Sequence, residues 1–320
     1  EKGQFLYLVS KNGNELFVDK REEIPDCLGL TEAPINIGDS VFHLCLNKNA
    51  TAEKAFIRYH NGLIKDFNWG DGSLLVYTPG AYEIKREGNQ IRGYEGVAVG
   101  LRNAIRNFTI CDINHPSDTL KEDILNIDGN PLALAVNWGQ TEAQDRIYVS
   151  VRGADELFQT YDSQGYLLKQ EYVGQWGLNS IYSMRMVGED RLLAGGVTTV
   201  TLNPDPGYTV EHLSLVLRDL TKNIGEEGAI ASLILLPIEE KYGGTIPGQY
   251  NMQVGKINGR WFVFGHIVLS NGTQFNGTKL ALFTQEFNPQ AMQFIGEPLF
   301  IAQGMGKKRR FEIFMSLIAR

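Results

Sequence analysis

The chain has 320 residues, a formal net charge of -7, 43% hydrophobic residues and 21% charged residues. This is the composition of an ordinary globular protein, and the length allows two average domains or one large all-β domain. The negative charge disfavours a nucleic-acid partner, because a phosphate backbone needs a cationic surface, and no apolar stretch approaches the roughly 18 residues of a membrane span.

The first half of the chain has the pattern of short strands joined by tight turns. Residues 5–10 and 15–20 flank Asn12-Gly13, the strongest short hairpin signal. Residues 116–128 fit either a strand near 120–127 or a helical turn. The other strands predicted in this half are 25–30, 35–38, 41–47, 55–60, 63–67, 73–78, 82–87, 96–101 and 108–113.

The second half predicts three units of four strands each. The pattern is clearest at 181–197, where two apolar runs flank the turn Gly188-Glu189-Asp190, and at 250–268, where Asn258-Gly259 supplies the turn. The three units are 132–137, 146–151, 157–161 and 166–172; then 181–187, 192–197, 213–217 and 229–236; then 252–257, 261–268, 279–284 and 292–301.

Four-stranded units that repeat every ~40 to 50 residues are typical of a β-propeller. About 25 predicted strands fit six blades better than seven, so we expect one all-β domain, a six-bladed propeller over residues 1–320. Stacked β-sandwiches would also have many strands, but no polar linker separates such domains in this sequence.

The two ends of the chain predict how the propeller closes. Residues 311–318 form a lone apolar strand with no partner after it, and residues 5–10 have no inner strand before them. Because free strand edges expose unpaired backbone groups, we expect the C-terminal strand to pair with the N-terminal strand in one blade.

Loops that enter the innermost strands of a propeller gather at one mouth of its channel, where such folds usually bind ligands. Several of these predicted loops place aromatic rings beside Gly, Asn and Asp, and one carries the cationic run Lys307–Arg310. The predicted mouth loops are 30–34, 68–72, 127–130, 173–180, 239–249 and 302–310. The candidate ligand-binding residues in them are Trp69, Asp71, Trp176, Asn179, Tyr242, Lys307 and Arg309.

Exposed aromatic rings beside carboxamides and carboxylates suit sugars, because rings stack on sugar C–H faces and hydroxyls take hydrogen bonds. The alternative for Trp69 and Trp176 is packing between adjacent blades. The run at 307–310 attracts carboxylate or phosphate groups if it faces the channel, and is otherwise a solvated loop.

Motifs of known catalytic chemistry are missing from the sequence. It has no G-x-S-x-G elbow and no phosphate-binding loop, and its His and Cys residues have no metal-ligand spacing, so we expect neither a metal nor a cofactor. Cleavage of a glycan would need two carboxylates ~5 to 10 Å apart. The acids available in the predicted mouth loops are Glu32, Asp71, Asp128, Glu239 and Glu240.

The sequence thus predicts a secreted, periplasmic or cell-surface propeller that binds a carbohydrate or another polar small molecule, including an anionic one, at the channel mouth. Two alternatives stay open: a glycoside hydrolase or other glycan-cleaving enzyme, and a protein-interaction propeller. The sequons at Asn49, Asn107, Asn271 and Asn276 matter only in a glycosylating compartment.

Overall fold

The computed structural model describes residues 4–12, 15–24, 27–30, 35–37, 40–47, 55–59, 75–99, 102–110, 120–201, 209–237, 247–269 and 279–305. Regular structure in these ranges is β-strand, apart from two short 3-10 turns, η2 (Glu142–Gln144) and η3 (Val173–Trp176). The described strands form six sheets, five with four strands and one with two. The all-β prediction and its four-stranded antiparallel sheets are confirmed.

The chain divides into two compact units, one with β1 to β10 and one that begins at Leu132, near the start of β11, and includes β22. In the first unit β1 pairs with β2, while β3, β4 and β6 all pair with β5. The strands of this unit are β1 (Gln4–Asn12), β2 (Glu15–Ile24), β3 (Cys27–Leu30), β4 (Ile35–Ile37), β5 (Ser40–Asn47), β6 (Ala55–Tyr59), β7 (Leu75–Glu87), β8 (Gln90–Val99), β9 (Arg102–Ile110) and β10 (Leu120–Asn126).

Two predictions in this unit are wrong. β3 and β4 belong to one sheet, so the loop at 30–34 does not connect two sheets and does not enter a new innermost strand. Residues 73–78 and 82–87 do not form two strands either, because β7 is one strand whose register to β8 shifts between Tyr77 and Tyr82. Pro79 and Gly80 lie in that irregularity, where a missing N–H and a flexible backbone are tolerated.

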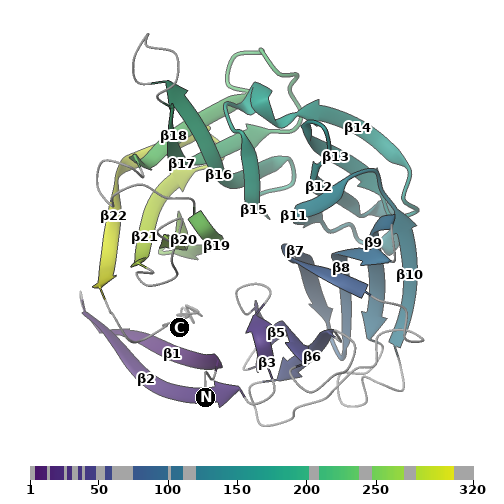
Figure 1. The fold of residues 1–320 in the computed structure, drawn as a ribbon, viewed down its shortest axis with the longest axis horizontal. Coiled ribbons are helices and arrows are strands. Elements are labelled where there is room, and N and C mark those ends of the chain that lie inside the picture. The colour runs from purple at the N-terminus through teal and green to yellow at the C-terminus, as the bar shows by residue number, and fades with distance from the viewer. Residues whose placement is uncertain are drawn as a thin grey trace. The chain divides into compact units, whose positions relative to one another are not determined.

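β7 to β10 form one sheet in chain order, sheet C (Figure 1). The turn between β7 and β8 contains Gly88 in the left-handed region, with φ 63°. Gly93 on β8 is required by close packing, because a Cβ at this position would lie 2.1 Å from Cζ of the Phe108 ring on β9. The strand near 120–127 is confirmed as β10, and the helical-turn alternative is excluded.

The second unit contains three four-stranded sheets, and all three predicted groupings are confirmed. Each sheet uses four consecutive strands, and Figure 1 shows the sheets following one another in chain order. Sheet D has β11 (Asn130–Asn137), β12 (Arg146–Arg152), β13 (Glu156–Asp162) and β14 (Leu167–Tyr172); sheet E has β15 (Ser180–Met186), β16 (Arg191–Thr201), β17 (Thr209–Asp219) and β18 (Ile230–Pro237); sheet F has β19 (Pro247–Ile257), β20 (Arg260–Leu269), β21 (Lys279–Asn288) and β22 (Gln293–Met305).

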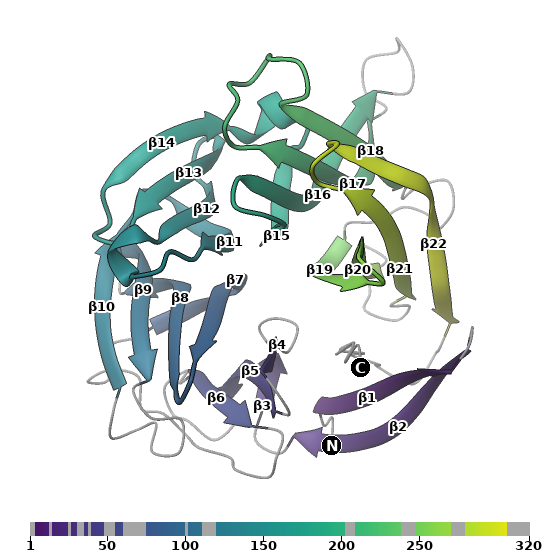
Figure 2. The same cartoon turned by 180° about the vertical axis from the view of Figure 1, so that it is seen from behind.

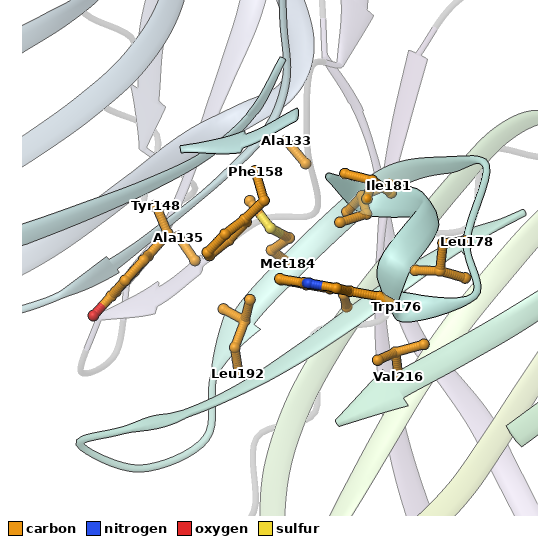
Figure 3. Packing of buried hydrophobic residues seen from close by; sticks show 12 residues of the cluster. Ala133, Ala135, Tyr148, Phe158, Trp176, Leu178, Ile181, Met184, Leu192 and Val216 are labelled. Carbon is orange, nitrogen blue, oxygen red and sulfur yellow. The ribbon is translucent and has the colours of Figure 1, made fainter. Parts of the chain in front are cut away.

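Sheets D, E and F pack face to face, with sheet E in the middle. Strand β17 shows why, because Leu213, Leu215 and Leu217 alternate onto the face toward sheet F, whereas Val216 lies on the face toward sheet D. We call the buried side chains between sheets D and E the D–E cluster; Figure 3 draws it, with Phe158 from sheet D, Met184 and Val216 from sheet E, and Trp176 from η3 among its members. β15 also contacts β19, and β18 contacts β22, so sheets E and F run first strand beside first and last beside last.

The predicted closing strand at 311–318 lies outside the described residues, as does the predicted strand at 63–67. The count of six blades and the closure of a ring therefore stay predictions.

Candidate functional site

The predicted mouth loop at 173–180 is described throughout and connects β14 to β15. It begins with η3, and Gly177 ends η3 in the left-handed region, with φ 78°. The loop is held against β16 by two hydrogen bonds: Thr198 Oγ1 donates to the Gly177 carbonyl oxygen (2.6 Å), and the Asn179 N–H donates to the Val197 carbonyl oxygen (2.6 Å). These bonds fix the path by which the chain enters the first strand of sheet E.

Glu156, the first residue of β13, joins sheet D to the start of β15. Its carboxylate accepts hydrogen bonds from the Ser180 hydroxyl (2.7 Å), the Ile181 backbone N–H (2.7 Å) and the Ser150 hydroxyl (3.2 Å). Gly196 on β16 approaches the same point so closely that a Cβ there would lie 1.9 Å from the Ser180 carbonyl oxygen. The start of β15 is therefore bonded to β13 of sheet D on one side and packed closely against β16 of its own sheet on the other.

Trp176 does not offer a ring face to a ligand. Its side chain is only 2% exposed, and its ring lies 4.5 Å from the Phe158 ring, centroid to centroid, in the D–E cluster (Figure 3). Trp176 therefore packs between sheets, as the alternative interpretation had it, and the prediction that its ring stacks on a ligand is wrong. A Trp beside a turn glycine is compatible with both roles in sequence, and only the covering sheet decides between them.

A buried ion pair lies beneath this loop and anchors Trp176. Glu171 on β14 accepts from Arg218 Nη2 (2.9 Å) and from the indole Nε1 of Trp176 (3.0 Å), while the exposed Lys169 ammonium lies 2.8 Å from the same carboxylate. Arg218 is fully buried and also donates to the backbone carbonyls of Lys222 and Ala229. Glu171 and Arg218 thereby connect sheets D and E.

Burial alone would raise the pKa of Glu171, but hydrogen bonds from Arg218 and Lys169 outweigh it and hold the pKa below its ordinary value. Glu171 is therefore ionised at neutral pH and neutralises Arg218. This marks Glu171 as a structural carboxylate rather than a proton donor, because a general acid needs a raised pKa.

Exposed polar side chains lie on the loop at 173–180 and on the neighbouring turn between β12 and β13. We define the D–E rim as residues 152–156 and 173–180, which the Glu156–Ser180 hydrogen bond brings together. Arg152, Asp155, Gln175 and Asn179 are all exposed on this rim. They supply a guanidinium, a carboxylate and two carboxamides, groups that bind hydroxyls and small anions. Asn179 is the predicted site residue that the described structure places at an exposed position.

The remaining predicted site residues, Trp69, Asp71, Tyr242, Lys307 and Arg309, lie outside the described residues, as do Glu32, Glu239 and Glu240. Asp128 is exposed in the turn before β11. The residues that sequence reasoning missed are Glu156 and Glu171, because a single acid at a strand end carries no motif.

Across the described ranges, no group of three His, Cys, Asp or Glu side chains is arranged to hold a metal ion. The helices found in the described part of the chain include none long and apolar enough to cross a membrane.

No family model and no curated protein matches this sequence. Solved structures with a similar arrangement include an α-L-arabinanase of Cellvibrio cellulosa, at 12% identity over 85% of this chain and 96% of that one, with a TM-score of 0.45. Another is an exo-1,5-α-L-arabinanase from a bovine ruminal metagenomic library, at 10% identity over 85% and 97%, with a TM-score of 0.47. A third is the N-terminal domain of Nup159, at 11% identity over 89% and 66%, with a TM-score of 0.35. Likeness at these scores transfers no function to this chain.

Proposed function

We propose that this protein binds a carbohydrate or a similar polar ligand at the D–E rim. The observation that carries this proposal is the bonding of Glu156 to Ser180 and Ile181, which fixes the loop that presents Gln175 and Asn179. Polar groups that are held in place before binding lose little conformational entropy when a ligand arrives. Carboxamides beside a carboxylate provide both donors and acceptors, as sugar hydroxyls require.

The wider arrangement is part of the same proposal. We infer that the six described sheets are blades of one secreted or surface propeller, closed by residues 311–318, with the D–E rim at the mouth of its channel. The face-to-face order of sheets D, E and F supports this inference. Trp69, Asp71, Tyr242, Lys307 and Arg309 are then proposed to complete the site from the other mouth loops.

A glycan array followed by titration calorimetry on the glycans that bind tests the proposal. We expect Asn179→Ala and Gln175→Ala each to weaken binding by about twofold to tenfold, the cost of one hydrogen bond of about 0.5–1.5 kcal/mol. Gln290→Ala is the matched control, because Gln290 is also exposed but lies in the turn between β21 and β22. Failure of the wild-type chain to bind any glycan, or wild-type affinity in both rim variants, would contradict the proposal.

Glycan cleavage is the alternative that we retain, because the predicted mouth loops other than the loop at 30–34 hold four acids. The rim itself does not favour it: the Glu156 carboxylate already accepts three hydrogen bonds within the protein, which suits a positioning role. Release of reducing ends from the glycans that bind would support cleavage. Separate Ala variants of Asp71, Asp128, Glu239 and Glu240 would then identify the two carboxylates.

A further inference from the structure

The outer edge of sheet D carries an unusual amount of exposed apolar surface. Of the eight large hydrophobic side chains that are exposed among the described residues, four lie on β14 or directly before it. They are Tyr166 (71% exposed), Leu167 (50%), Leu168 (51%) and Tyr172 (53%). β14 is the last strand in the order of sheet D, on the outside of that sheet (Figure 2), so the N–H and C=O groups of alternate residues face away from β13.

The outer edge of sheet F carries a bulge and a proline, neither of which occurs in β14 between Lys169 and Tyr172. In β22 the register to β21 shifts between Ile295 and Leu299, and Gly296 in this bulge has φ 70°. The side-chain amide of Gln285 holds the bulge by donating to the carbonyls of Ile295 (2.8 Å) and Gly296 (3.3 Å). Pro298 removes a backbone donor from the same edge. Bulges and prolines are common means of preventing edge-to-edge pairing.

β14 instead keeps a regular pairing with β13 from Lys169 to Tyr172, after a single irregularity at Leu168. Its sequence Leu168-Lys169-Gln170-Glu171-Tyr172 is also complementary to itself. If two copies pair antiparallel around Gln170, Leu168 lies opposite Tyr172 of the other copy. Lys169, which contacts the buried Glu171 of its own copy, then lies opposite Glu171 of the other copy, so that no like charges face each other. A shift of two residues would instead place Lys169 opposite Lys169, or Glu171 opposite Glu171, and like charges directly opposite are destabilising.

We propose that β14 is a homodimerisation edge, at which a second copy of this chain pairs antiparallel with register centred on Gln170. The pairing satisfies the outer backbone groups of both copies and covers the exposed leucine and tyrosine side chains. It is isologous, since the same strand is used by both subunits, and so it closes after two copies. β14 ends at Tyr172, directly before the D–E rim, but the pairing uses none of the rim residues, so the proposal does not depend on the proposed function.

Sedimentation velocity over a wide concentration range, on the full chain, tests the pairing and its register. We expect the wild-type chain to dimerise, and Leu168→Lys and Tyr172→Glu each to raise the dimer dissociation constant at least about tenfold. The double variant L168K/Y172E should restore dimerisation, because the register places the new Lys opposite the new Glu. Leu299→Lys on β22, where Leu299 is 63% exposed, is the matched control and should dimerise like the wild type. Thermal unfolding of each variant verifies that it folds.

A wild-type chain that stays monomeric at every concentration would overturn the proposal and leave β14 as an edge for a different partner. A dimer that survives Leu168→Lys would also overturn it, because the contact would then lie elsewhere. Folded single variants that lose the dimer, with no recovery in the double variant, would refute the antiparallel register.

Discussion

Replacing Glu171 with Gln should destabilise the protein far more than a surface substitution does. The change keeps the shape of the side chain and its capacity to accept from Trp176, but it removes the negative charge beside Arg218. The Arg218 side chain is 0% exposed and that of Glu171 is 6% exposed, so solvent cannot replace the lost charge. Removal of one partner from a buried ion pair costs about 3–5 kcal/mol, because the other charge remains buried without compensation.

Urea unfolding monitored by tryptophan fluorescence measures this loss, since Trp176 bonds to the same carboxylate. Lys169→Gln is the matched control: it removes the third member of the group, whose side chain is 45% exposed, and should cost at most about 1 kcal/mol. If Glu171→Gln lowers the free energy of unfolding by no more than the control does, the pair is not a structural anchor and the argument fails.

The ion pair between Glu171 and Arg218 also predicts that the free energy of unfolding depends on pH. The pKa of Glu171 is lower in the folded protein than its ordinary value of 4.5, so folding favours its ionised form. The stability that it contributes is present above pH 4.5 and is lost as the pH falls through the folded pKa. The difference in unfolding free energy between wild type and Glu171→Gln should therefore shrink on acidification below pH 4.5. A difference that stays constant into that range would contradict the assignment.

Three further predictions follow from other parts of the chain. Gly196→Ala should lower the free energy of unfolding by about 1–3 kcal/mol or more, because the new Cβ would meet the Ser180 carbonyl oxygen. Gly174→Ala is the control and should be tolerated, because a Cβ there would have nothing within 4 Å. Equal effects of the two variants in thermal or urea unfolding would refute the close approach. Asn107 belongs to a glycosylation sequon but is only 7% exposed in the middle of β9. Mass spectrometry of protein from a glycosylating host should therefore find Asn107 unmodified, and a glycan attached to it would contradict its burial. If residues 311–318 close the ring as proposed, deletion of residues 311–320 should leave the chain insoluble or unfolded, because losing even three large side chains from buried positions costs ~1.5 to 3 kcal/mol each. A soluble truncation with an unchanged melting temperature would refute closure.

Strands with strong turn signals were predictable from the sequence. Asn258 and Gly259 both have positive φ in the turn between β19 and β20, which is the conformation that an Asn-Gly hairpin requires, and that strand pair was predicted within a few residues. Gly88-Asn89 has the same kind of signal and would have located the turn between β7 and β8. Pro79-Gly80 was misread, because a Pro-Gly pair serves equally in a turn and in a bulge inside a continuing strand.

The candidate site was less predictable, because its roles depend on contacts between sheets. Trp176 lies next to glycines, a setting that exposed binding residues share, but its burial comes from Phe158 on sheet D. Asn179 was correctly predicted to be a polar residue of the loop before β15, since its position follows from the turn alone. Glu171 appeared as an ordinary strand residue, and only the partner Arg218, 47 positions later, makes it an anchor.

The construction of each sheet from four consecutive strands has a consequence for how the second unit folds. Within each sheet of this unit, every strand after the first pairs with the strand just before it, so the loops that must close are short and the entropy of closing them is small. Contacts that are local in sequence form quickly, and each sheet can pair as soon as its four strands have left the ribosome. The cores between sheets wait for the next sheet to be made. Sheet D therefore gains its cover from sheet E, and sheet E from sheet F, in the order of synthesis, so that native packing advances along the chain without pairing between its distant parts.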